Sequence, residues 1–154
     1  MPYNHKMPVQ QIYTAYDGKD HPVAGLFRYC PRCKAGLVIR EIAHKPRAVC
    51  PNCGFIQFRN PAPTIAVLIL HEEQVLLGKR SGEPGMGKWA TPSGYIEYED
   101  DFLTAAVREV LEETGLEVEI ESILNVSSSF MAPEYHFLDV YLLARVVSGA
   151  AMAG

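Results

Sequence analysis

Long apolar runs and internal repeats are missing from this 154-residue sequence. No segment approaches eighteen uninterrupted apolar residues, and the start, MPYNHKMPVQ, lacks the apolar core of a signal peptide. These absences argue against a membrane-spanning or secreted protein, so we expect a cytoplasmic protein with no membrane partner. Low-complexity tracts are also missing, and an apolar content of 48% is sufficient for a folded core.

Acidic residues are scarce in one segment and abundant in the next. Residues 27–60 hold seven Lys or Arg and a single acid, Glu41, whereas residues 61–154 hold five basic residues and fifteen acids. Between them lies Asn60-Pro61-Ala62-Pro63, which is stiff because each proline fixes its own backbone and restricts the residue before it. We therefore expect two modules of opposite charge. Their expected bounds are an N-terminal extension 1–26, a small module 27–60, a larger domain 61–148 and a tail 149–154.

All four cysteines fall in the basic module. They form two Cys-Pro-x-Cys pairs, with sixteen residues between the inner two cysteines, at Cys30, Cys33, Cys50 and Cys53. Two residues between cysteines allow a tight turn to direct both thiolates at one ion, and two such turns supply the four soft ligands of tetrahedral zinc. The spacing predicts a zinc ribbon whose closed ligand shell leaves the metal a structural role. A pair of disulfides and a redox dithiol are the less favoured alternatives.

The positive charge of the zinc ribbon has two interpretations. A four-thiolate zinc centre carries about two negative charges, so part of the surplus only balances the metal site. The remainder would steer a polyanion towards the neighbouring domain or contact nucleic acid. For this remainder we favour steering of a polyanion, and nucleic-acid binding is the secondary alternative.

Hydrophobic patterning predicts the elements of the larger domain. The run TIAVLIL at 64–70 and the residues 75–77 after a polar turn predict a hairpin. Residues 81–94, with four glycines and two prolines around the only tryptophan, predict a mostly irregular loop. A helix is predicted from 101 to 114, capped by Asp100 or Asp101 and ended by Gly115. Its apolar side is expected to comprise Phe102, Leu103, Ala105, Ala106, Val107 and Val110. Strands are predicted at 118–123 and 136–147.

Three carboxylates share one face of that helix. Each helical residue advances by about 100°, so Glu109, Glu112 and Glu113 fall within an arc of about 100°. Like charges at this spacing repel one another, and a divalent cation would reverse that cost. Hard oxygen ligands favour magnesium or manganese, both of which also bind phosphate oxygens. The alternative is an ordinary solvated acidic face.

The surrounding residues resemble a known signature. Gly94, then the run R-E-V-L-E-E-T-G-L from Arg108 to Leu116, resembles the Nudix hydrolase box, with every defined position of that run matching. The resemblance implies an α+β Nudix fold, an α/β/α sandwich with a mixed sheet. It also implies that Glu109, Glu112 and Glu113, together with a backbone carbonyl of Ser93 or Gly94, bind magnesium or manganese, and that Arg108 orients the carboxylates.

Two positions depart from the signature. Asp100 stands where the family usually has Glu, and one methylene less is expected to weaken its contact with Arg108. Ser93 replaces a frequent glycine. The implied chemistry is attack of a metal-activated water on a diphosphate.

The domain order narrows the substrate class. A zinc ribbon followed by N-P-x-P and a Nudix domain resembles the NADH, FAD and ADP-ribose pyrophosphatases. Only fragments of the NADH motif S-Q-P-W-P-F-P-x-S occur here, so an ADP-ribose or FAD-like dinucleotide ranks above NADH. The candidate substrate-binding residues are Arg80, Lys88, Trp89 and Glu97, with Arg80 the preferred diphosphate contact. For Trp89, packing of the loop is favoured over stacking on a base.

The proton acceptor is less defined, because family members often take a catalytic glutamate from a loop beyond the last residues of this sequence. A trimmed chain, a partner subunit and a nearer base are the open explanations, with Glu134 preferred over His136 and Asp139 as that base. Related enzymes are commonly dimers, so a homodimer is expected. The rival functions are a regulator that binds nucleotide or RNA without cleaving it, and a structural zinc adaptor.

Overall fold

The computed structural model describes residues 27–82, 85–132 and 135–151, and the side chains of 130–132 and 135 are not described. The chain divides into two compact units at the junction between Asn60 and Pro61. The expected extension 1–26 lies outside the described residues. No helix within the described part is long and apolar enough to cross a membrane.

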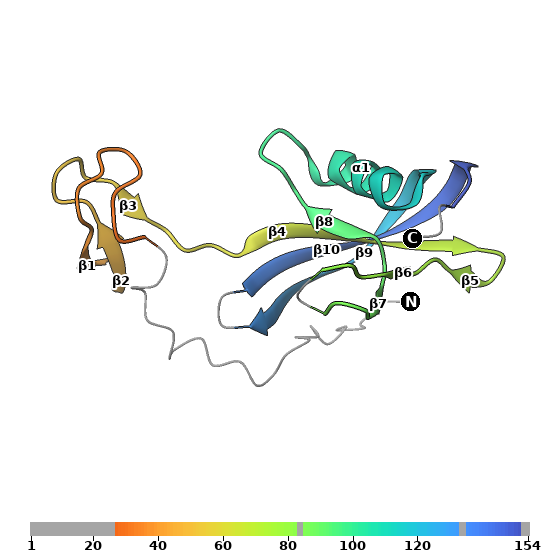
Figure 1. Ribbon diagram of the computed structural model, residues 1–154, viewed down its shortest axis with the longest axis horizontal. Coiled ribbons are helices and arrows are strands. Elements are labelled where there is room, and N and C mark those ends of the chain that lie inside the picture. The colour runs from red at the N-terminus through yellow and green to blue at the C-terminus, as the bar shows by residue number, and fades with distance from the viewer. Residues whose placement is uncertain (1–26, 83–84, 133–134, 152–154) are drawn as a thin grey trace, which may run out of the picture. The chain divides into compact units, whose positions relative to one another are not determined.

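The first unit is a small antiparallel sheet with two cysteine-bearing turns (Figure 1). Its strands are β1 (Val38–Ile42), β2 (Lys45–Val49) and β3 (Ile56–Gln57), in the order β1-β2-β3. Both turns close in the same way, with the amide of Lys34 bonding the carbonyl of Cys30 at 2.9 Å and the amide of Gly54 bonding that of Cys50 at 3.1 Å. The repeated turn brings the two cysteine pairs into equivalent conformations.

A mixed sheet forms the second unit. Its long strands are β4 (Ala62–His71), β9 (Leu116–Ala132) and β10 (Tyr135–Gly149), where β10 pairs parallel with β4 and antiparallel with β9. Short strands β5 (Gln74–Val75) and β8 (Ser93–Tyr95) both pair antiparallel with β4. A separate ribbon is formed by β6 (Gly78–Lys79) and β7 (Trp89–Ala90).

Helix α1 (Phe102–Thr114) packs on one face of this sheet (Figure 1). Asp101 caps its start, because its carboxylate accepts hydrogen bonds from the amides of Leu103 and Thr104. Gly115 ends it with a positive φ of 73°, and its amide bonds the carbonyl of Leu111. The described residues contain this one helix, so the expected mixed sheet is present with one helical layer described.

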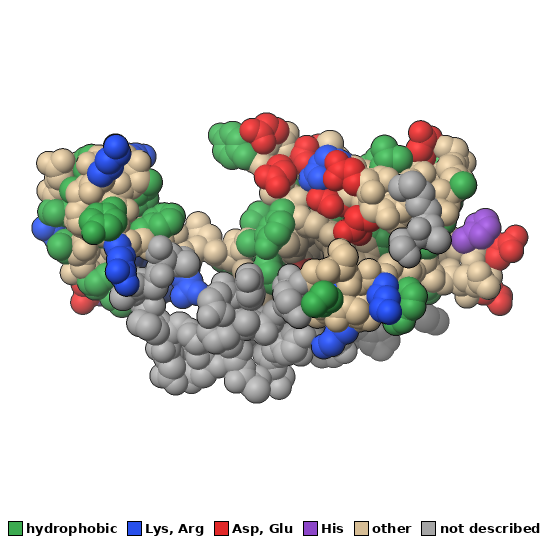
Figure 2. Space-filling model, viewed as in Figure 1, with side chains coloured by type: hydrophobic (Ala, Val, Ile, Leu, Met, Phe, Trp, Pro, Cys, Tyr) green, Lys and Arg blue, Asp and Glu red, His purple; other side chains and the backbone are tan. Residues whose placement is uncertain are grey.

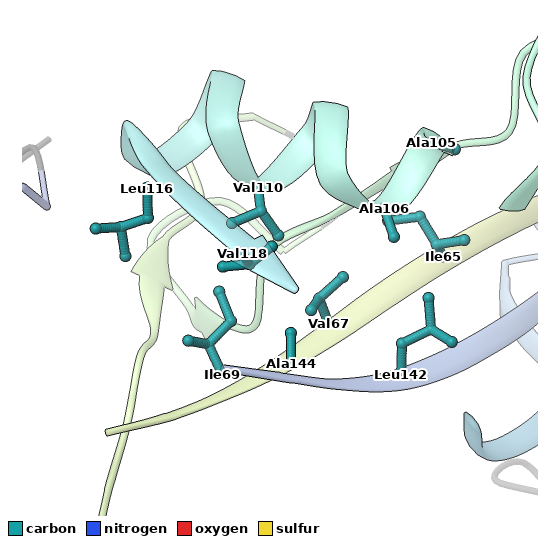
Figure 3. Close-up of a cluster of buried hydrophobic side chains, with 10 residues drawn as sticks. All are labelled: Ile65, Val67, Ile69, Ala105, Ala106, Val110, Leu116, Val118, Leu142 and Ala144. Carbon is teal, nitrogen blue, oxygen red and sulfur yellow. The ribbon is translucent and has the colours of Figure 1, made fainter. Parts of the chain in front are cut away.

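The core lies between α1 and the sheet (Figure 3). Alternate residues of β4 point to α1, where they meet small side chains on the helix and residues from β9 and β10. The buried cluster consists of Ile65, Val67, Ile69, Ala105, Ala106, Val110, Leu116, Val118, Leu142 and Ala144. Two alanines in consecutive helix positions let the helix backbone approach the sheet closely. This packing fixes the position of the carboxylates that α1 carries.

Several element predictions need correction. Leu103 and Val107 were expected on the buried side of the helix, but they are 44% and 38% exposed because they lie beside the stripe of Ala105, Ala106 and Val110. The segment 81–94 is mostly irregular, as predicted, although it contains β7 and begins β8, whose residues pair with Gly78–Lys79 and with β4. The last two strands are also longer than predicted, because they pair with each other along most of their length.

Candidate active site and metal centre

The C-terminal half of α1 faces β8, and Glu113 makes the first contact between them. Its Oε2 accepts a hydrogen bond of 3.2 Å from the backbone amide of Ser93. Ser93 in turn lies in β8, opposite Ala66 of the central strand β4. One carboxylate of the predicted set is therefore held against the strand segment that was predicted to supply a metal-binding carbonyl.

Glu109 makes the second contact, over Gly94. A Cβ atom built on Gly94 would lie 2.1 Å from the carboxyl carbon of Glu109, which is a position that no side chain can share. The Glu109 side chain is only 16% exposed. Glycine at position 94 thus leaves the space in which this carboxylate lies, and the solvated acidic face considered from the sequence does not describe Glu109.

Arg108 ties the acidic residues together. Its guanidinium pairs with Asp100 at 3.0 Å, with Glu109 at 2.8 Å and with Glu112 at 3.4 Å. It also donates a hydrogen bond of 3.3 Å to the carbonyl of Tyr95 at the end of β8. These carboxylates raise the pKa of Arg108 further above its ordinary value, with Glu109 the largest cause and Asp100 the next.

The contact with Asp100 differs from the expectation based on its shorter side chain. Asp100 accepts a hydrogen bond of 3.0 Å from Nε of Arg108 and forms an ion pair with its Nη2, also at 3.0 Å, and the Asp100 side chain is 17% exposed. The aspartate therefore reaches Arg108 despite having one methylene less than glutamate. Figure 2 shows the result on the surface, where acidic side chains gather over α1 with a basic side chain among them.

A cavity of about 480 Å³ opens beside Glu113. It is lined by backbone and side chains of β6, the following loop, β7 and β8, and its lining residues are Gly78, Lys79, Arg80, Ser81, Gly82, Ala90, Thr91, Ser93 and Glu113. Two cations and three hydroxyls thus surround a space that borders a carboxylate of the box helix. Such a lining suits a phosphate group.

The pKa of Glu113 is raised above its ordinary value. Partial burial against β8 is the largest cause, and the charges of Glu109 and Glu112 add to it. The amide of Ser93 and the positive charge of Arg80 act in the opposite direction. A cation placed among these carboxylates would remove the repulsion that raises this pKa.

The remaining sequence candidates fall into different places. Arg80 lines the cavity, and its backbone amide bonds the carbonyl of Lys88 at 2.9 Å. Lys88 and Glu97 are exposed. Trp89 is 67% exposed, so the packing role favoured for it from the sequence is wrong in this structure. Glu134 lies outside the described residues.

The two alternative bases lie on β10. Asp139 accepts hydrogen bonds from the hydroxyl of Thr64, at 2.5 Å, and from that of Ser129. These two bonds hold the carboxylate of Asp139 within the sheet. His136 pairs in register with Phe130 of β9.

Sequence reasoning missed several cavity residues. Lys79, Ser81 and Thr91 were not among the candidate substrate-binding residues, and all three line the cavity. Their convergence depends on the pairing of Gly78 with Ala90 and of Lys79 with Trp89. A hairpin of two-residue strands leaves no periodic signal in a sequence. The proximity of these residues could therefore not be predicted from the sequence.

The four cysteines converge in the first unit. All four Sγ atoms lie within 4.8 Å of one another, with 3.5 Å between those of Cys30 and Cys53 and 3.4 Å between those of Cys33 and Cys50. All four are free thiols, which excludes the disulfide alternative for this structure. Tetrahedral zinc with four bonds of about 2.3 Å would separate the sulfurs by about 3.8 Å. The cluster therefore has the ligand number, chemistry and size of a metal site.

The thiols of this cluster differ in acidity. The backbone amide of Ala35 and the side chain of Asn52 lower the pKa of Cys33 to about 6. For Cys53 the backbone amide of Phe55 lowers the pKa, but burial and the neighbouring thiols outweigh it and raise the pKa to about 12. Four thiols this close favour one thiolate at the expense of another, and a bound cation would allow all four to ionise.

Comparison with known proteins identifies the second unit. The NUDIX domain model matches residues 60–152, which is more than half of the chain and includes the helix, β8 and the whole sheet. The chain belongs to the Nudix family. The α+β fold with a mixed sheet and the box on a helix, expected from the sequence, is thus confirmed.

Two enzymes are similar to this chain in sequence. The ADP-ribose pyrophosphatase of Methanocaldococcus jannaschii is 34% identical over 98 residues, which are 63% of this chain and 58% of that enzyme. The NAD-capped RNA hydrolase NudC of Pseudomonas aeruginosa is 32% identical over 122 residues, which are 79% of this chain and 42% of that enzyme. The chain thus spans about half the length of these relatives.

Solved Nudix structures have the same fold. A NUDIX hydrolase from Nitrosomonas europaea superposes with a TM-score of 0.70 at 29% identity, over 79% of this chain and 69% of that one. A MutT NUDIX hydrolase from Burkholderia pseudomallei superposes with a TM-score of 0.58 at 27% identity, over 62% of this chain and 74% of that one.

Proposed function

We propose that this Nudix protein hydrolyses the diphosphate bond of a nucleoside diphosphate derivative, with ADP-ribose or an FAD-like dinucleotide as substrate and a mononucleotide as one product. The observation that carries the proposal is the contact between α1 and β8, where Glu113 bonds the amide of Ser93 and Glu109 fills the space over Gly94. One box carboxylate, that of Glu113, lines a cavity to which Lys79 and Arg80 also contribute.

The site fits a divalent cation. Glu109, Glu112 and Glu113, with a carbonyl of Ser93 or Gly94, would supply an all-oxygen donor set, and the charges of Glu109 and Glu112 add to the burial that raises the pKa of Glu113. We propose magnesium or manganese as the ion. When bound, it supplies an activated water and neutralises charge on the diphosphate oxygens. Arg108 orients the carboxylates of Glu109 and Glu112 by pairing with them. This orientation lowers the free-energy cost of arranging the metal ligands.

Other residues of the chain would bind the substrate and accept the proton of the attacking water. Arg80, at the wall of the cavity that contains Glu113, would bind a phosphate of the substrate, aided by the nearby hydroxyls of Ser81 and Thr91. Lys88, Trp89 and Glu97 are exposed and remain candidates for contacts with the outer part of the substrate. Glu134 remains the candidate proton acceptor, because Asp139 is engaged by two hydroxyls within the sheet.

The cysteine cluster is proposed to hold one zinc ion with a structural role. Four sulfur ligands complete a tetrahedral shell and leave no open position for a substrate. We also propose that the protein works in the cytoplasm and forms a homodimer. Four free thiols agree with a reducing compartment.

A second candidate function is hydrolysis of NAD-capped RNA. The 122 residues aligned with the P. aeruginosa NudC exceed the 95 residues from position 60 to position 154, so the alignment includes at least 27 residues before position 60. The similarity to that enzyme therefore extends into the cysteine-bearing unit. This observation favours a capped RNA, or NADH as its small-molecule counterpart, as the alternative substrate.

The proposal is tested by incubating the full chain with ADP-ribose, FAD, NADH, diadenosine polyphosphates and NAD-capped RNA, with magnesium or manganese, and separating the products by chromatography. Release of a mononucleotide from ADP-ribose or FAD at the highest kcat/KM supports the leading proposal. Preference for capped RNA or NADH supports the second candidate. Tight binding of ADP-ribose without cleavage at saturating magnesium would instead identify a regulator.

A further inference from the structure

One face of the cysteine-bearing sheet carries a row of cations that the proposed hydrolysis does not use. Arg40 of β1 stands directly opposite Arg47 of β2 in the strand register. Side chains alternate along a strand, so Lys45 lies on the same face as Arg47. We call Arg40, Lys45, Arg47 and the adjacent Phe58 the cationic row.

The pairing of Arg40 with Arg47 is unfavourable without an anion. Residues directly opposite in an antiparallel pair have Cβ atoms about 5 Å apart, and like charges at this distance destabilise the sheet. Glu41 is the one carboxylate of residues 27–60 and follows Arg40 in β1, so it belongs to the other face. There it faces His44 at 3.6 Å. The cationic row therefore presents charge that a bound polyanion would neutralise.

An aromatic ring completes the row. The pairing of Ala48 with Gln57 places Phe58 one position beyond β3 and beside Arg47, and the Arg47 guanidinium lies 4.5 Å from the centroid of the Phe58 ring. Phe58 is nevertheless 55% exposed. A ring with one side on a guanidinium and an exposed remainder offers a surface on which a nucleobase can stack. Figure 2 shows basic and hydrophobic side chains side by side on this unit.

Zinc binding leaves most of this charge in place. Residues 27–60 have seven basic side chains and one acidic side chain, a net charge of +6 before the metal site is counted. A zinc ion with four thiolates adds about two negative charges, which leaves about four positive charges on this unit. Compensation of the metal site alone does not account for the cationic row.

We propose that the cationic row binds single-stranded RNA, with Arg40, Lys45 and Arg47 contacting phosphates and Phe58 stacking on a base. A single strand fits because its bases are free to stack, whereas a duplex would present only phosphates to Phe58. The choice of RNA over DNA rests on the capped-RNA candidate above. Binding by the row does not depend on which diphosphate the catalytic site cleaves.

The test measures fluorescence anisotropy of a labelled 15-nucleotide oligoadenylate with the full, zinc-loaded protein between 50 and 200 mM KCl. In Arg40→Gln/Lys45→Gln we expect the slope of log K against log[salt] to fall by about 1.4, because each lost phosphate contact on a single strand removes about 0.7. Phe58→Leu is expected to weaken binding at least about fivefold through the lost stacking. Arg28→Gln is the control, because it removes one exposed cation outside the row. We expect it to keep the affinity for the oligoadenylate, including the part that Phe58 contributes by stacking.

Three results would overturn the proposal. They are unchanged affinity and salt slope in the double variant, equal loss per charge in Arg28→Gln, and equal affinity for single-stranded DNA or duplex RNA of the same length. Zinc content and ADP-ribose turnover are measured on the same preparations. If ADP-ribose turnover is absent while the variants reduce RNA binding, the proposed hydrolysis is wrong and RNA binding by the cationic row is supported. If turnover is present while the variants leave RNA binding unchanged, only RNA binding by the row is rejected.

Discussion

Gly94→Ala is expected to disable the active site through a single methyl group. The new Cβ would lie 2.1 Å from the carboxyl carbon of Glu109, whereas ordinary contact begins near 3.4 Å. The carboxylate must therefore move by at least 1.3 Å, or α1 must move away from β8. The core residues on α1 resist the second response, because Ala105, Ala106 and Val110 are fully buried against the sheet.

The magnitude follows from this displacement. A misplacement of about 1 Å in a catalytic group costs about 100-fold in rate, so kcat/KM should fall at least about 100-fold. Core overpacking destabilises a fold by about 1–3 kcal/mol, but the clash here falls on the end of a flexible side chain, so the protein should stay folded at room temperature.

The assay is magnesium-dependent hydrolysis of ADP-ribose, or of the best substrate found in the screen, together with a thermal melt of each protein. Gly36→Ala is the matched control, because its Cβ would meet no atom within 4 Å. It should keep wild-type turnover. If Gly94→Ala retains full activity with an unchanged melting temperature, Glu109 does not need its position over Gly94, and the reasoning fails.

Three further outcomes are expected. Arg108→Lys keeps the charge but loses the fork that reaches Asp100, Glu109 and Glu112, so the magnesium concentration for half-maximal activity should rise about 10- to 100-fold; an unchanged magnesium titration would contradict this role. Glu113 has a raised pKa in the folded protein, so its effect favours folding at low pH and is lost as the pH rises through that pKa. In magnesium-free buffer the melting temperature of Glu113→Gln should therefore rise relative to that of the wild type as the pH rises from 4 to 8. A difference in melting temperature that stays constant with pH would refute the raised pKa of Glu113. Cys50→Ser should reduce bound zinc from one ion per chain to none or to a weakly held ion, as measured by atomic absorption after dialysis, whereas full retention would exclude the four-sulfur site.

Local signals in the sequence were sufficient for the box helix. Asp101 and Gly115 are residues that cap helices for simple steric and hydrogen-bonding reasons, and the structure places the helix ends there. The spacing of Cys30, Cys33, Cys50 and Cys53 likewise predicted a convergent cluster, because each pair needs only a tight turn.

Features that depend on long-range pairing were not predictable in the same way. The cavity is formed where Lys79 pairs with Trp89, two residues ten positions apart in the sequence. The bond between Ser93 and Glu113 joins residues twenty positions apart, and it depends on how α1 packs on the sheet. Likewise, only the register of β1 with β2 shows that Arg40 and Arg47 are neighbours.

Glu112→Gln tests most directly whether the carboxylates on α1 support metal-dependent cleavage of a diphosphate. Glu112 is 60% exposed, so its replacement should leave the fold and the melting temperature unchanged. Turnover of the best dinucleotide substrate is measured at saturating magnesium for wild type and variant, with the mononucleotide product quantified by chromatography. We expect kcat to fall by at least about 100-fold. Wild-type turnover by Glu112→Gln would contradict a catalytic role for these carboxylates.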